Sequence, residues 1–385
     1  MKIVFIGQKG IPAKGGGVER HVEELATRLV RAGHEVMVYT RPGYVCKNLK
    51  EYKGVKLISL PSIHTKHFDA ITSTFLACLD LIFKREVDIV HFHSIGPSSL
   101  ILLVKIFKPR VPVIATFHTQ CYYHKKWGVI ARAYLKFGEF ICCLMADKTI
   151  AVSKNLKKYG ENKYKRKMYY IPNGVSIGNN LKPYKIKNWN LKEGGYILTV
   201  SRLVKHKGLH YLIEAYKDLK TDKKLVITGG GAFTDDYVEE LKLISEGNKN
   251  IIFTGNQIGD ALSELYSNAY FFVQSSEFEG LSIALLEAMS YGRAVLVSDI
   301  PGNKEVVEEI SLTFRNKDVV DLGKKMEHLL ENPELVKEIG RVGKARVKKY
   351  YNWEDIVDDI INVYKNVLGN KKLPEKISEL SKVSV

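Results

Sequence analysis

Short runs of consecutive apolar residues alternate along this chain with longer stretches in which apolar residues recur at every third or fourth position. Runs of the first kind are typical of strands buried in a parallel sheet, and stretches of the second kind are typical of amphipathic helices. A strand at 2–7, a helix at 18–31 and a strand at 35–40 form the first such unit. Because strands and helices continue to alternate, the pattern predicts an α/β protein whose parallel sheets are covered on both faces.

The alternation falls into two series, separated by a polar and irregular stretch at 176–195 that predicts a linker. A chain of 385 residues exceeds what one hydrophobic core usually serves, so we expect two domains, at 1–175 and 190–350. The expected strands are 2–7, 35–40, 88–93, 113–118, 148–152 and 168–171 in the first series and 196–200, 224–228, 251–254, 270–274 and 294–298 in the second.

The net charge of +17 predicts an anionic partner, such as nucleic acid, an anionic membrane surface or a phosphorylated substrate. An excess of lysine without any such partner is the alternative. The five cysteines show no C-x-x-C spacing, so neither a disulfide framework nor a zinc site is expected, and a reducing cytoplasm fits best. The longest apolar stretch, an expected helix at 98–107, is far shorter than the roughly 20 residues of a membrane-spanning helix. We therefore expect a cytoplasmic protein, either soluble or peripheral to a membrane.

A glycine-rich loop, QKGIPAKGGGVER at 8–20, joins the first strand to the first helix. Glycines at such a turn are typical of phosphate sites in α/β proteins. The loop is not a G-x-G-x-x-G, however, and no acidic residue ends the second strand, where Tyr39, Thr40 and Arg41 stand. This departure disfavours a nicotinamide or flavin site, and no cofactor is expected.

In the second series, SRLVKHKG at 201–208 follows a strand and therefore lies at the carboxyl edge of the sheet, where open α/β folds bind ligands. Arg202 and Lys207 would place two cations there, of which the arginine can grip a phosphate with two parallel hydrogen bonds. Glycines at 229–231 close the next strand and would let the backbone approach a phosphate. A solvated basic loop is the alternative.

The segment from 275 to 305 contains an acidic loop and then an apolar helix, expected at 281–291. Glu279 precedes the helix and Glu287 lies inside it, with seven residues between them, so that both can face one ligand. Buried carboxylates need hydrogen-bond donors, which hydroxyl-rich ligands such as sugars and ribose supply. The alternatives are a solvated loop carboxylate at Glu279 and a helix-surface residue at Glu287.

A metal centre is not expected. The chain contains no Asp-x-Asp, the usual way of presenting a divalent cation to a nucleoside diphosphate. Two cations and helix N-termini can neutralise such a leaving group without a metal. His91 and His93 alternate on a strand and could point at one metal ion from the same face, but no acidic or sulfur ligand stands near them in the sequence.

Taken in order, the motifs of this chain resemble those of the retaining glycosyltransferases of family 4. They are GGGVERHVEELA (15–26), DIVHFHS (88–94), ATFHT (115–119), ADKTIAVS (146–153), IPNGV (171–175), SRLVKHKG (201–208), ITGGG (227–231) and EGLSIALLEAMSYGRAVLVSDIPGNKEVV (279–307). The resemblance implies the GT-B fold, in which two Rossmann-like domains face each other across a cleft. It also implies that the last helix, at about 351–385, packs back on the first domain.

The same resemblance implies roles for individual residues. Glu287 would bind the ribose of the nucleotide, and Glu279 would bind hydroxyls of the donor sugar. Arg202 and Lys207 would hold the diphosphate and stabilise it as it leaves, and His118 would touch the transferred sugar, although a structural core histidine is the alternative there. The remaining donor-binding residues would act largely through backbone groups; they are Gly16, Gly17, Gly230, Gly280, Leu281 and Ser282.

These roles imply a metal-independent hexosyltransferase that uses a UDP-sugar, or next a GDP-sugar, and a glycan or lipid-linked acceptor in the synthesis of a surface polysaccharide such as capsule or lipopolysaccharide. The alternatives are a nucleotide-sugar epimerase of GT-B fold, which needs no acceptor, and a non-catalytic partner subunit. Subunits of the latter kind usually lose the arginine, lysine or glutamate positions, which this chain keeps.

Two basic segments bear on the acceptor. Residues 124–140 interleave lysine, arginine and aromatic residues at helical spacing, and residues 157–170 are basic and rich in tyrosine. Such segments favour docking on the anionic inner face of the plasma membrane, whereas an ordinary solvated helix is the alternative. No nucleic-acid-binding motif is present, so no nucleic acid partner is expected.

Overall fold

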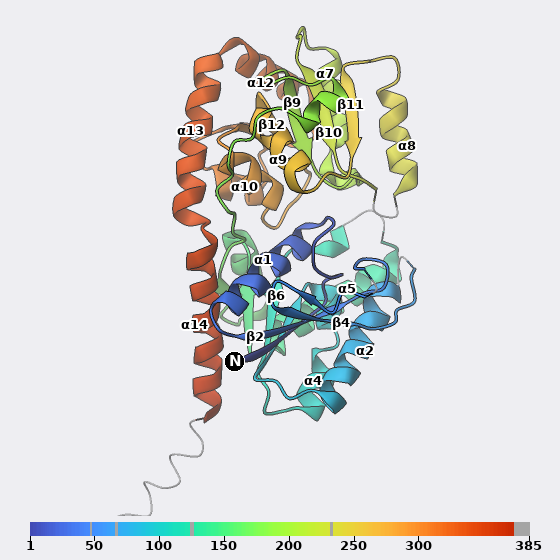
Figure 1. The fold of residues 1–385 in the computed structure, drawn as a ribbon, viewed down its shortest axis with the longest axis vertical. Helices are drawn as coiled ribbons and strands as arrows, with labels where there is room; N and C mark the ends of the chain where they lie inside the picture. The colour runs from blue at the N-terminus through green and yellow to red at the C-terminus, as the bar shows by residue number, and fades with distance from the viewer. Residues whose placement is uncertain (47, 66–67, 124–126, 232–233, 373–385) are drawn as a thin grey trace, which may run out of the picture. The chain divides into compact units, whose positions relative to one another are not determined.

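The computed structural model describes residues 1–46, 48–65, 68–123, 127–231 and 234–372 (Figure 1). They form two compact units. Of the described residues, unit 1 contains 1–123, 127–172 and 353–372, and unit 2 contains those between 173 and 352.

The core of unit 1 is an eight-stranded sheet with the order β3-β4-β2-β1-β5-β6-β7-β8, in which only β3 and β4 pair antiparallel. The inner strands β1, β5 and β6 are buried along almost their whole length, as expected of parallel strands with both faces covered. The strands are β1 (Lys2–Ile6), β2 (Glu35–Thr40), β3 (Glu51–Tyr52), β4 (Val55–Ser59), β5 (Ile89–His93), β6 (Val113–Phe117), β7 (Lys148–Ala151) and β8 (Tyr169–Tyr170).

One face of this sheet packs against two helices from opposite ends of the chain, α1 and α14 (Figure 1). Apolar residues at helical spacing, such as Val22 and Leu25 of α1 and Ile360 of α14, are fully or almost fully buried. Each such side chain contributes about 1.5–3 kcal/mol relative to remaining exposed. The helices of unit 1 are α1 (Gly17–Arg31), α2 (Phe68–Lys84), α3 (Ile95–Ser98), α4 (Ile101–Phe107), η1 (Cys121–Tyr123), α5 (Val129–Leu144), α6 (Lys154–Tyr164) and α14 (Trp353–Lys372).

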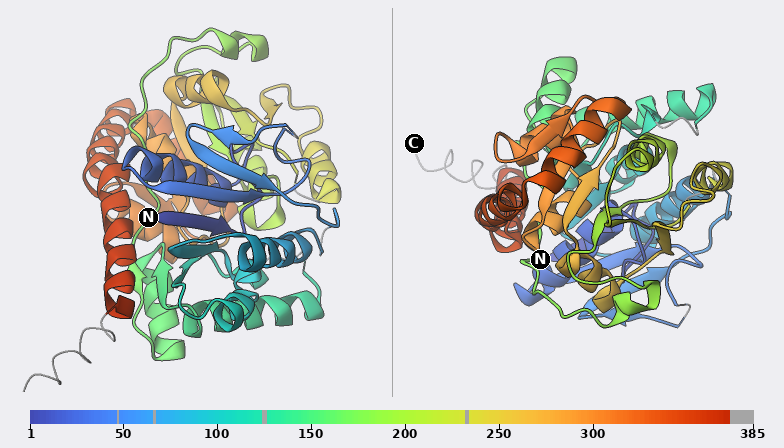
Figure 2. Two further views of the ribbon diagram at one scale, coloured as in Figure 1. Left: turned by 60° about the horizontal axis from the view of Figure 1, so that its bottom comes forward. Right: turned by 90° about the horizontal axis from the view of Figure 1, so that it is seen from above.

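Unit 2 contains a six-stranded, wholly parallel sheet with the order β11-β10-β9-β12-β13-β14 (Figure 2). The first strand of this unit, β9, therefore pairs with both β10 and β12, and the chain reverses its direction of travel across the sheet between β9 and β12. Ligands of open α/β sheets bind beside the carboxyl ends of the strands at such a reversal. The strands are β9 (Tyr196–Val200), β10 (Lys224–Thr228), β11 (Ile251–Gly255), β12 (Phe271–Gln274), β13 (Ala294–Ser298) and β14 (Leu312–Phe314).

The helices of unit 2 bury their apolar stripes against this sheet, and Leu212, Leu241 and Leu322 of three of them are completely buried. These helices are η2 (Lys185–Trp189), η3 (Lys205–Lys207), α7 (Leu209–Lys217), α8 (Asp235–Ile244), α9 (Gly259–Asn268), α10 (Ile283–Ser290), α11 (Pro301–Val307), α12 (Val319–Glu331) and α13 (Pro333–Tyr350). Among the described residues of both units, no helix combines the length and the apolar character needed to cross a bilayer.

One expected feature of unit 1 was wrong in detail, and one helix was not expected from the sequence. The helix expected at 98–107 is divided into α3 and α4, and the Ser99 hydroxyl donates to the Gly96 carbonyl at 2.8 Å across the break. Such local bonds compete with the helical pattern. The basic segment 157–170 mostly forms α6, which has no broad apolar stripe but begins where the Ser153 hydroxyl accepts from the Leu156 amide at 3.2 Å.

Two features of unit 2 also differ from expectation. The stretch expected as a linker at 176–195 packs on α9, since the Glu264 carboxylate accepts from the amides of Tyr184 and Lys185 at 2.9 and 2.6 Å. The sequence pair Pro301–Gly302, which by itself predicts a turn, instead forms the first turn of α11, a position that suits a proline because it lacks a backbone donor. Of the expected membrane-docking segment, residues 124–126 lie outside the described residues, as do residues 373–385 of the stretch expected to contain the last helix.

Candidate functional site

Two loops meet at the carboxyl ends of β9 and β12 in unit 2. The Ser275 hydroxyl, after β12, donates to the Lys207 carbonyl, after β9, at 3.0 Å. Gly208 adopts φ +64°, and a Cβ atom at this position would lie 2.0 Å from the Ser275 carbonyl oxygen. Only glycine satisfies both the backbone angle and the spacing, so this residue determines how closely the two loops approach.

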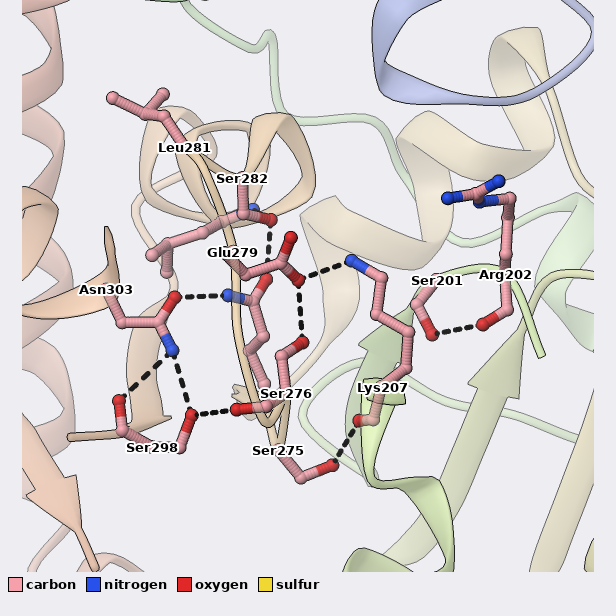
Figure 3. Close-up of polar contacts among 12 residues, drawn as sticks. Ser201, Arg202, Lys207, Ser275, Ser276, Glu279, Leu281, Ser282, Ser298 and Asn303 are labelled. Carbon is pink, nitrogen blue, oxygen red and sulfur yellow. Dashed lines mark hydrogen bonds and ion pairs between the residues drawn. The ribbon is translucent and has the colours of Figure 1, made fainter. Parts of the chain in front are cut away.

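Lys207 and Glu279 form an ion pair where these loops meet, although 71 residues separate them in the chain (Figure 3). Their side chains are 14% and 13% exposed. The Ser276 hydroxyl donates to the same carboxylate oxygen of Glu279 at 2.7 Å. The structure thus places a cation, a carboxylate and a hydroxyl together in a largely water-excluded position at the sheet edge.

A buried network of polar side chains supports the Glu279 loop from below (Figure 3). The Asn303 amide of α11 donates to the Ser298 hydroxyl and carbonyl at 3.0 and 3.1 Å, and Ser298 in turn donates to the Ser276 carbonyl at 2.5 Å. Gln274 links Asn303 to Ser282, with hydrogen bonds of 2.6 Å on each side. Because every member has a partner, the network gives the loop one defined conformation.

Sequence reasoning missed Gln274, Ser276, Ser298 and Asn303. The signal that could have found them is the abrupt change from apolar to polar residues at the carboxyl ends of β12 and β13. Gly302 belongs to the same support, because a Cβ atom there would lie 2.7 Å from the Glu279 carbonyl oxygen. Helix α11 therefore packs directly beneath the acidic loop.

Arg202 lies after β9 on the same sheet edge, half-buried, and its guanidinium stands apart from the Lys207–Glu279 pair (Figure 3). In the described part of the chain, no ion pair involves this guanidinium. Gly229 and Gly230 pack beside the Arg202 loop: the Gly230 carbonyl accepts from the Leu203 amide at 2.9 Å, and a Cβ atom at Gly229 would lie 1.8 Å from the Ser201 oxygen. These glycines therefore have a packing role in the fold, and their approach to a phosphate stays a prediction.

The other two acidic residues near this edge have different surroundings. Glu287 of α10 accepts a hydrogen bond from the Tyr266 hydroxyl at 3.1 Å, and Tyr266 stacks on Tyr291. Glu277 contacts the Tyr211 hydroxyl at 3.2 Å and Lys317 at 3.3 Å. Burial, with the Glu277 charge in addition, raises the pKa of Tyr211 to about 12, so this hydroxyl stays protonated and ties Glu277 to α7.

The start of α10 lies close to where the sequence predicted it. Helix α10 begins at Ile283, and the Ser282 hydroxyl caps it by accepting from the Leu285 amide at 3.4 Å. Gly280 and Leu281 are buried just before the cap, and the Leu281 carbonyl accepts from the Asn173 side chain at 2.9 Å. The first turn of α10 thus leads directly from the Glu279 loop, which gives that loop the positive end of a helix.

In unit 1, the glycine loop lies before α1. Gly16 has φ +98° and precedes the first helical residue, Gly17. Two glutamates of α1 hold the loop: Glu19 accepts from the Lys9 amide at 3.2 Å and Glu23 accepts from the Ala13 amide at 2.7 Å. A Cβ atom at Gly16 would lie 2.2 Å from the Glu19 carboxylate, so the tight loop requires glycine at that position.

His118 follows β6 and is only 7% exposed. Its Nε2 atom lies 3.2 Å from Nδ1 of His93, at the end of β5. His21 of α1 approaches both, with ring centroids 5.0 Å from His118 and 5.5 Å from His93. Burial first, and neighbouring histidines second, lower the pKa of both His93 and His118 well below the ordinary value, so both rings are neutral at pH 7.

His91 and His93 alternate on β5, so the sequence allowed both to bind one metal ion, but His91 is not available as a ligand. Both ring nitrogens of His91 are hydrogen-bonded, to Tyr364 and to Thr116, each at 2.7 Å. Among the described residues, the three side chains that come together with potential metal-ligand atoms are His21, His93 and His118, and one nitrogen of each lies within 4.8 Å of the others. A tetrahedral zinc site needs ligand nitrogens only about 3.4 Å apart, so this group is wider than a formed zinc site.

Two family models match this chain, one in each half. The model of "Glycosyltransferase Family 4" matches residues 15–178, and the model of "Glycosyl transferases group 1" matches residues 183–346. An uncharacterized glycosyltransferase of Methanocaldococcus jannaschii is 29% identical over 95% of this chain and 98% of its own length. Phosphatidyl-myo-inositol mannosyltransferase of Mycolicibacterium smegmatis is 26% identical over 92% of this chain and 91% of its own.

Among solved structures, HepE of Anabaena in complex with UDP-glucose superposes with a TM-score of 0.79. The match covers 95% of this chain and 100% of HepE at 18% identity, a level that establishes similarity of fold.

Proposed function

Because the chain belongs to the family 4 glycosyltransferases, which have the GT-B fold, we propose that it is a retaining hexosyltransferase acting on a UDP-sugar and a glycan or lipid-linked acceptor. The observation that supports the proposal is the Lys207–Glu279 pair. It lies at the carboxyl ends of β9 and β12, between which the strand order of the unit 2 sheet reverses. A buried cation beside a buried carboxylate suits a ligand that carries both a diphosphate and hydroxyl groups. UDP is preferred to GDP since HepE was solved with UDP-glucose.

Lys207 and Arg202 bind the diphosphate in this proposal. A diphosphate offers Lys207 more negative charge than the single carboxylate of Glu279, so donor binding draws the ammonium toward the phosphates. Glu279 is then able to accept hydrogen bonds from hydroxyls of the donor sugar, while Ser276 keeps it in place. Arg202 adds a planar guanidinium that can grip phosphate oxygens in pairs.

Backbone groups complete the donor site. The amides of Gly280, Leu281 and Ser282 lie before the first turn of α10, where the helix dipole favours negative charge. Gly230 in unit 2 and Gly16 and Gly17 in unit 1 are proposed to approach the donor through their backbones.

Glu287 is proposed to bind the ribose. A carboxylate can accept about four hydrogen bonds, so the bond from Tyr266 and bonds from ribose hydroxyls are compatible. Tyr266 then orients the carboxylate for the nucleotide.

The proposed reaction breaks the bond between the anomeric carbon and the diphosphate, and the acceptor hydroxyl attacks from the same face. Arg202 and Lys207 take up the charge that develops on the leaving phosphate, so that no metal is required. An oxygen of the leaving phosphate accepts the proton of the acceptor hydroxyl. From unit 1, His118 is proposed to contact the transferred sugar.

The acceptor side of the proposal rests on the charge of +17 and on the exposed face of α5. Val129 and Ile130 are 83% and 87% exposed, and Phe137 and Phe140 follow on the same face. Arg132 and Lys136 are exposed among them. Apolar residues flanked by cations suit the surface of an anionic membrane, here its cytoplasmic face, where a lipid-linked acceptor for surface polysaccharide synthesis would be found.

Donor choice is tested by thermal shift with UDP-, GDP- and ADP-sugars, because a ligand at 100 times its Kd stabilises by about 2.7 kcal/mol. A positive donor is then incubated with and without acceptor. Retained anomeric configuration in the product supports the proposal, whereas inversion, or conversion of the donor to an epimer without acceptor, contradicts it.

Membrane docking is tested by flotation with vesicles of anionic or zwitterionic lipid. Ile130→Ser should weaken binding to anionic vesicles. The matched control is Phe83→Ser on α2, which removes a residue that is 75% exposed but belongs to another helix. Equal loss in both variants, or no binding of the wild type at low salt, would refute docking through α5.

A further inference from the structure

A chain of contacts in unit 1 runs from the last helix to His118. The buried Tyr364 hydroxyl of α14 bonds His91 at 2.7 Å, and the ring of His91 stacks on that of His93 with centroids 4.3 Å apart. His93 then bonds His118. The His93 ring is also held edge-on by Phe5, at 5.1 Å between centroids. Its orientation is therefore determined from two sides before any ligand binds.

The surroundings of His93 determine which of its nitrogens carries the proton. In the described part of the chain, Nε2 of His93 is buried and has no hydrogen-bond partner. A buried N–H without an acceptor is rarer and more costly than a bare acceptor atom. The proton of the neutral ring therefore lies on Nδ1, which faces Nε2 of His118.

The proton position of His93 determines that of His118. Since Nδ1–H of His93 donates to Nε2 of His118, the latter nitrogen must carry a lone pair, and the single proton of neutral His118 lies on its Nδ1. A histidine in this state offers a ligand a hydrogen-bond donor at Nδ1. It has no unoccupied basic nitrogen with which to take a proton.

We propose that His93 is a positioning residue that fixes His118 as its Nδ1–H tautomer, so that His118 donates a hydrogen bond to a hydroxyl of the transferred sugar and does not act as a base. This rests on the proposed function, in which His118 contacts that sugar. His91, bonded to Thr116 and to Tyr364 of the returning helix α14, keeps the His93 ring in place.

The tautomer is tested directly by NMR of the wild-type protein labelled with ¹⁵N-histidine, and the His118→Asn spectrum identifies the His118 signals. The expected result is a protonated Nδ1 and an unprotonated Nε2 in His118. A protonated Nε2, or a doubly protonated ring at pH 7, overturns the proposal. This measurement requires no activity, so it remains decisive if the proposed glycosyl transfer is not observed.

The positioning role is tested with two variants of similar shape, His93→Asn and His93→Leu. The asparagine amide can still donate from the place of Nδ1, whereas leucine cannot. His93→Leu should lower kcat/KM by about tenfold, the value of one hydrogen bond, while His93→Asn stays within about threefold of wild type. Both variants should still show a donor-induced thermal shift, because the proposed diphosphate-binding residues Arg202 and Lys207 belong to unit 2 and are unchanged. Equal activity of the two variants, whether high or low, contradicts the positioning role, and the wild-type NMR result stands even if either variant fails to fold.

Discussion

Replacing Lys207 by methionine tests the candidate donor site most directly. Methionine keeps the length and the apolar stem of lysine but removes the charge, so the Glu279 carboxylate retains only the Ser276 hydroxyl among its observed donors. Exposed ion pairs contribute about 0.2–1 kcal/mol, whereas removal of one partner of a fully buried pair costs about 3–5 kcal/mol. With side chains 14% and 13% exposed, the pair lies toward the buried limit, and we expect a cost of about 2–3 kcal/mol.

In a unit of this size, that cost corresponds to a fall in melting temperature of about 4–12 °C. The effect on catalysis should be larger, because the lysine is proposed to neutralise charge that develops on the leaving diphosphate. Loss of one such electrostatic partner typically lowers turnover by about 10²–10³-fold. The assay is nucleotide release in the presence of the donor and acceptor identified by thermal shift, combined with thermal unfolding of the full chain.

Lys205→Met is the matched control. Lys205 lies two residues earlier and pairs with Glu240, but these side chains are 36% and 39% exposed. Its loss should cost less than about 1 kcal/mol and leave turnover within a few-fold of wild type. If Lys207→Met keeps turnover within tenfold of wild type, or if the control loses as much, Lys207 does not bind the diphosphate.

Three further outcomes are expected. Arg202→Ala should lower turnover by a factor of about 10² or more with little change in melting temperature, and normal transfer by this variant would exclude Arg202 from the donor site. Gly208→Ala should destabilise unit 2 by more than about 1 kcal/mol in denaturant unfolding, because the new Cβ would lie 2.0 Å from the Ser275 oxygen at a positive φ. Gly247→Ala is the control, since that position also has a positive φ but open space around it. Burial lowers the pKa of His91, His93 and His118 in the folded state, so the unfolded chain binds more protons at acidic pH. The free energy of unfolding should therefore fall as the pH drops below the ordinary histidine pKa of 6.5. A melting temperature that does not change between pH 7 and pH 5 would contradict the burial of these three rings.

The sequence predicted which residues form the candidate donor site, a prediction that stays open, but it did not show how these residues are paired. The spacing of Glu279 and Glu287 indicated two carboxylates that serve one ligand, and their proposed roles remain compatible with the structure. In the folded chain, however, Glu279 contacts Lys207 and Glu287 contacts Tyr266. These partners could not be predicted, since contacts between residues far apart in the chain depend on strand order.

The polar network beneath the Glu279 loop could not be predicted for the same reason. Gln274, Ser298 and Asn303 are polar residues at the ends of apolar elements, a position that is equally common for solvated loop residues. Only the pairing of β12 with β13 and the packing of α11 show that they bond one another. Helix α6 was missed for a different reason, because a short lysine-rich helix has too little apolar periodicity to be recognised.

What the sequence determined by itself is the local part of this protein: most of the strands and helices, the glycine turns and the placing of Arg202, Lys207 and Glu279 after strand ends. These follow from periodicity and backbone preference, which act over a few residues. The tertiary structure decided which side chains meet. His91 and Tyr364 are 273 residues apart in the chain and 2.7 Å apart in the fold, because α14 returns to the sheet of unit 1. Burial at that point, which no local pattern specifies, is also what keeps the histidines neutral.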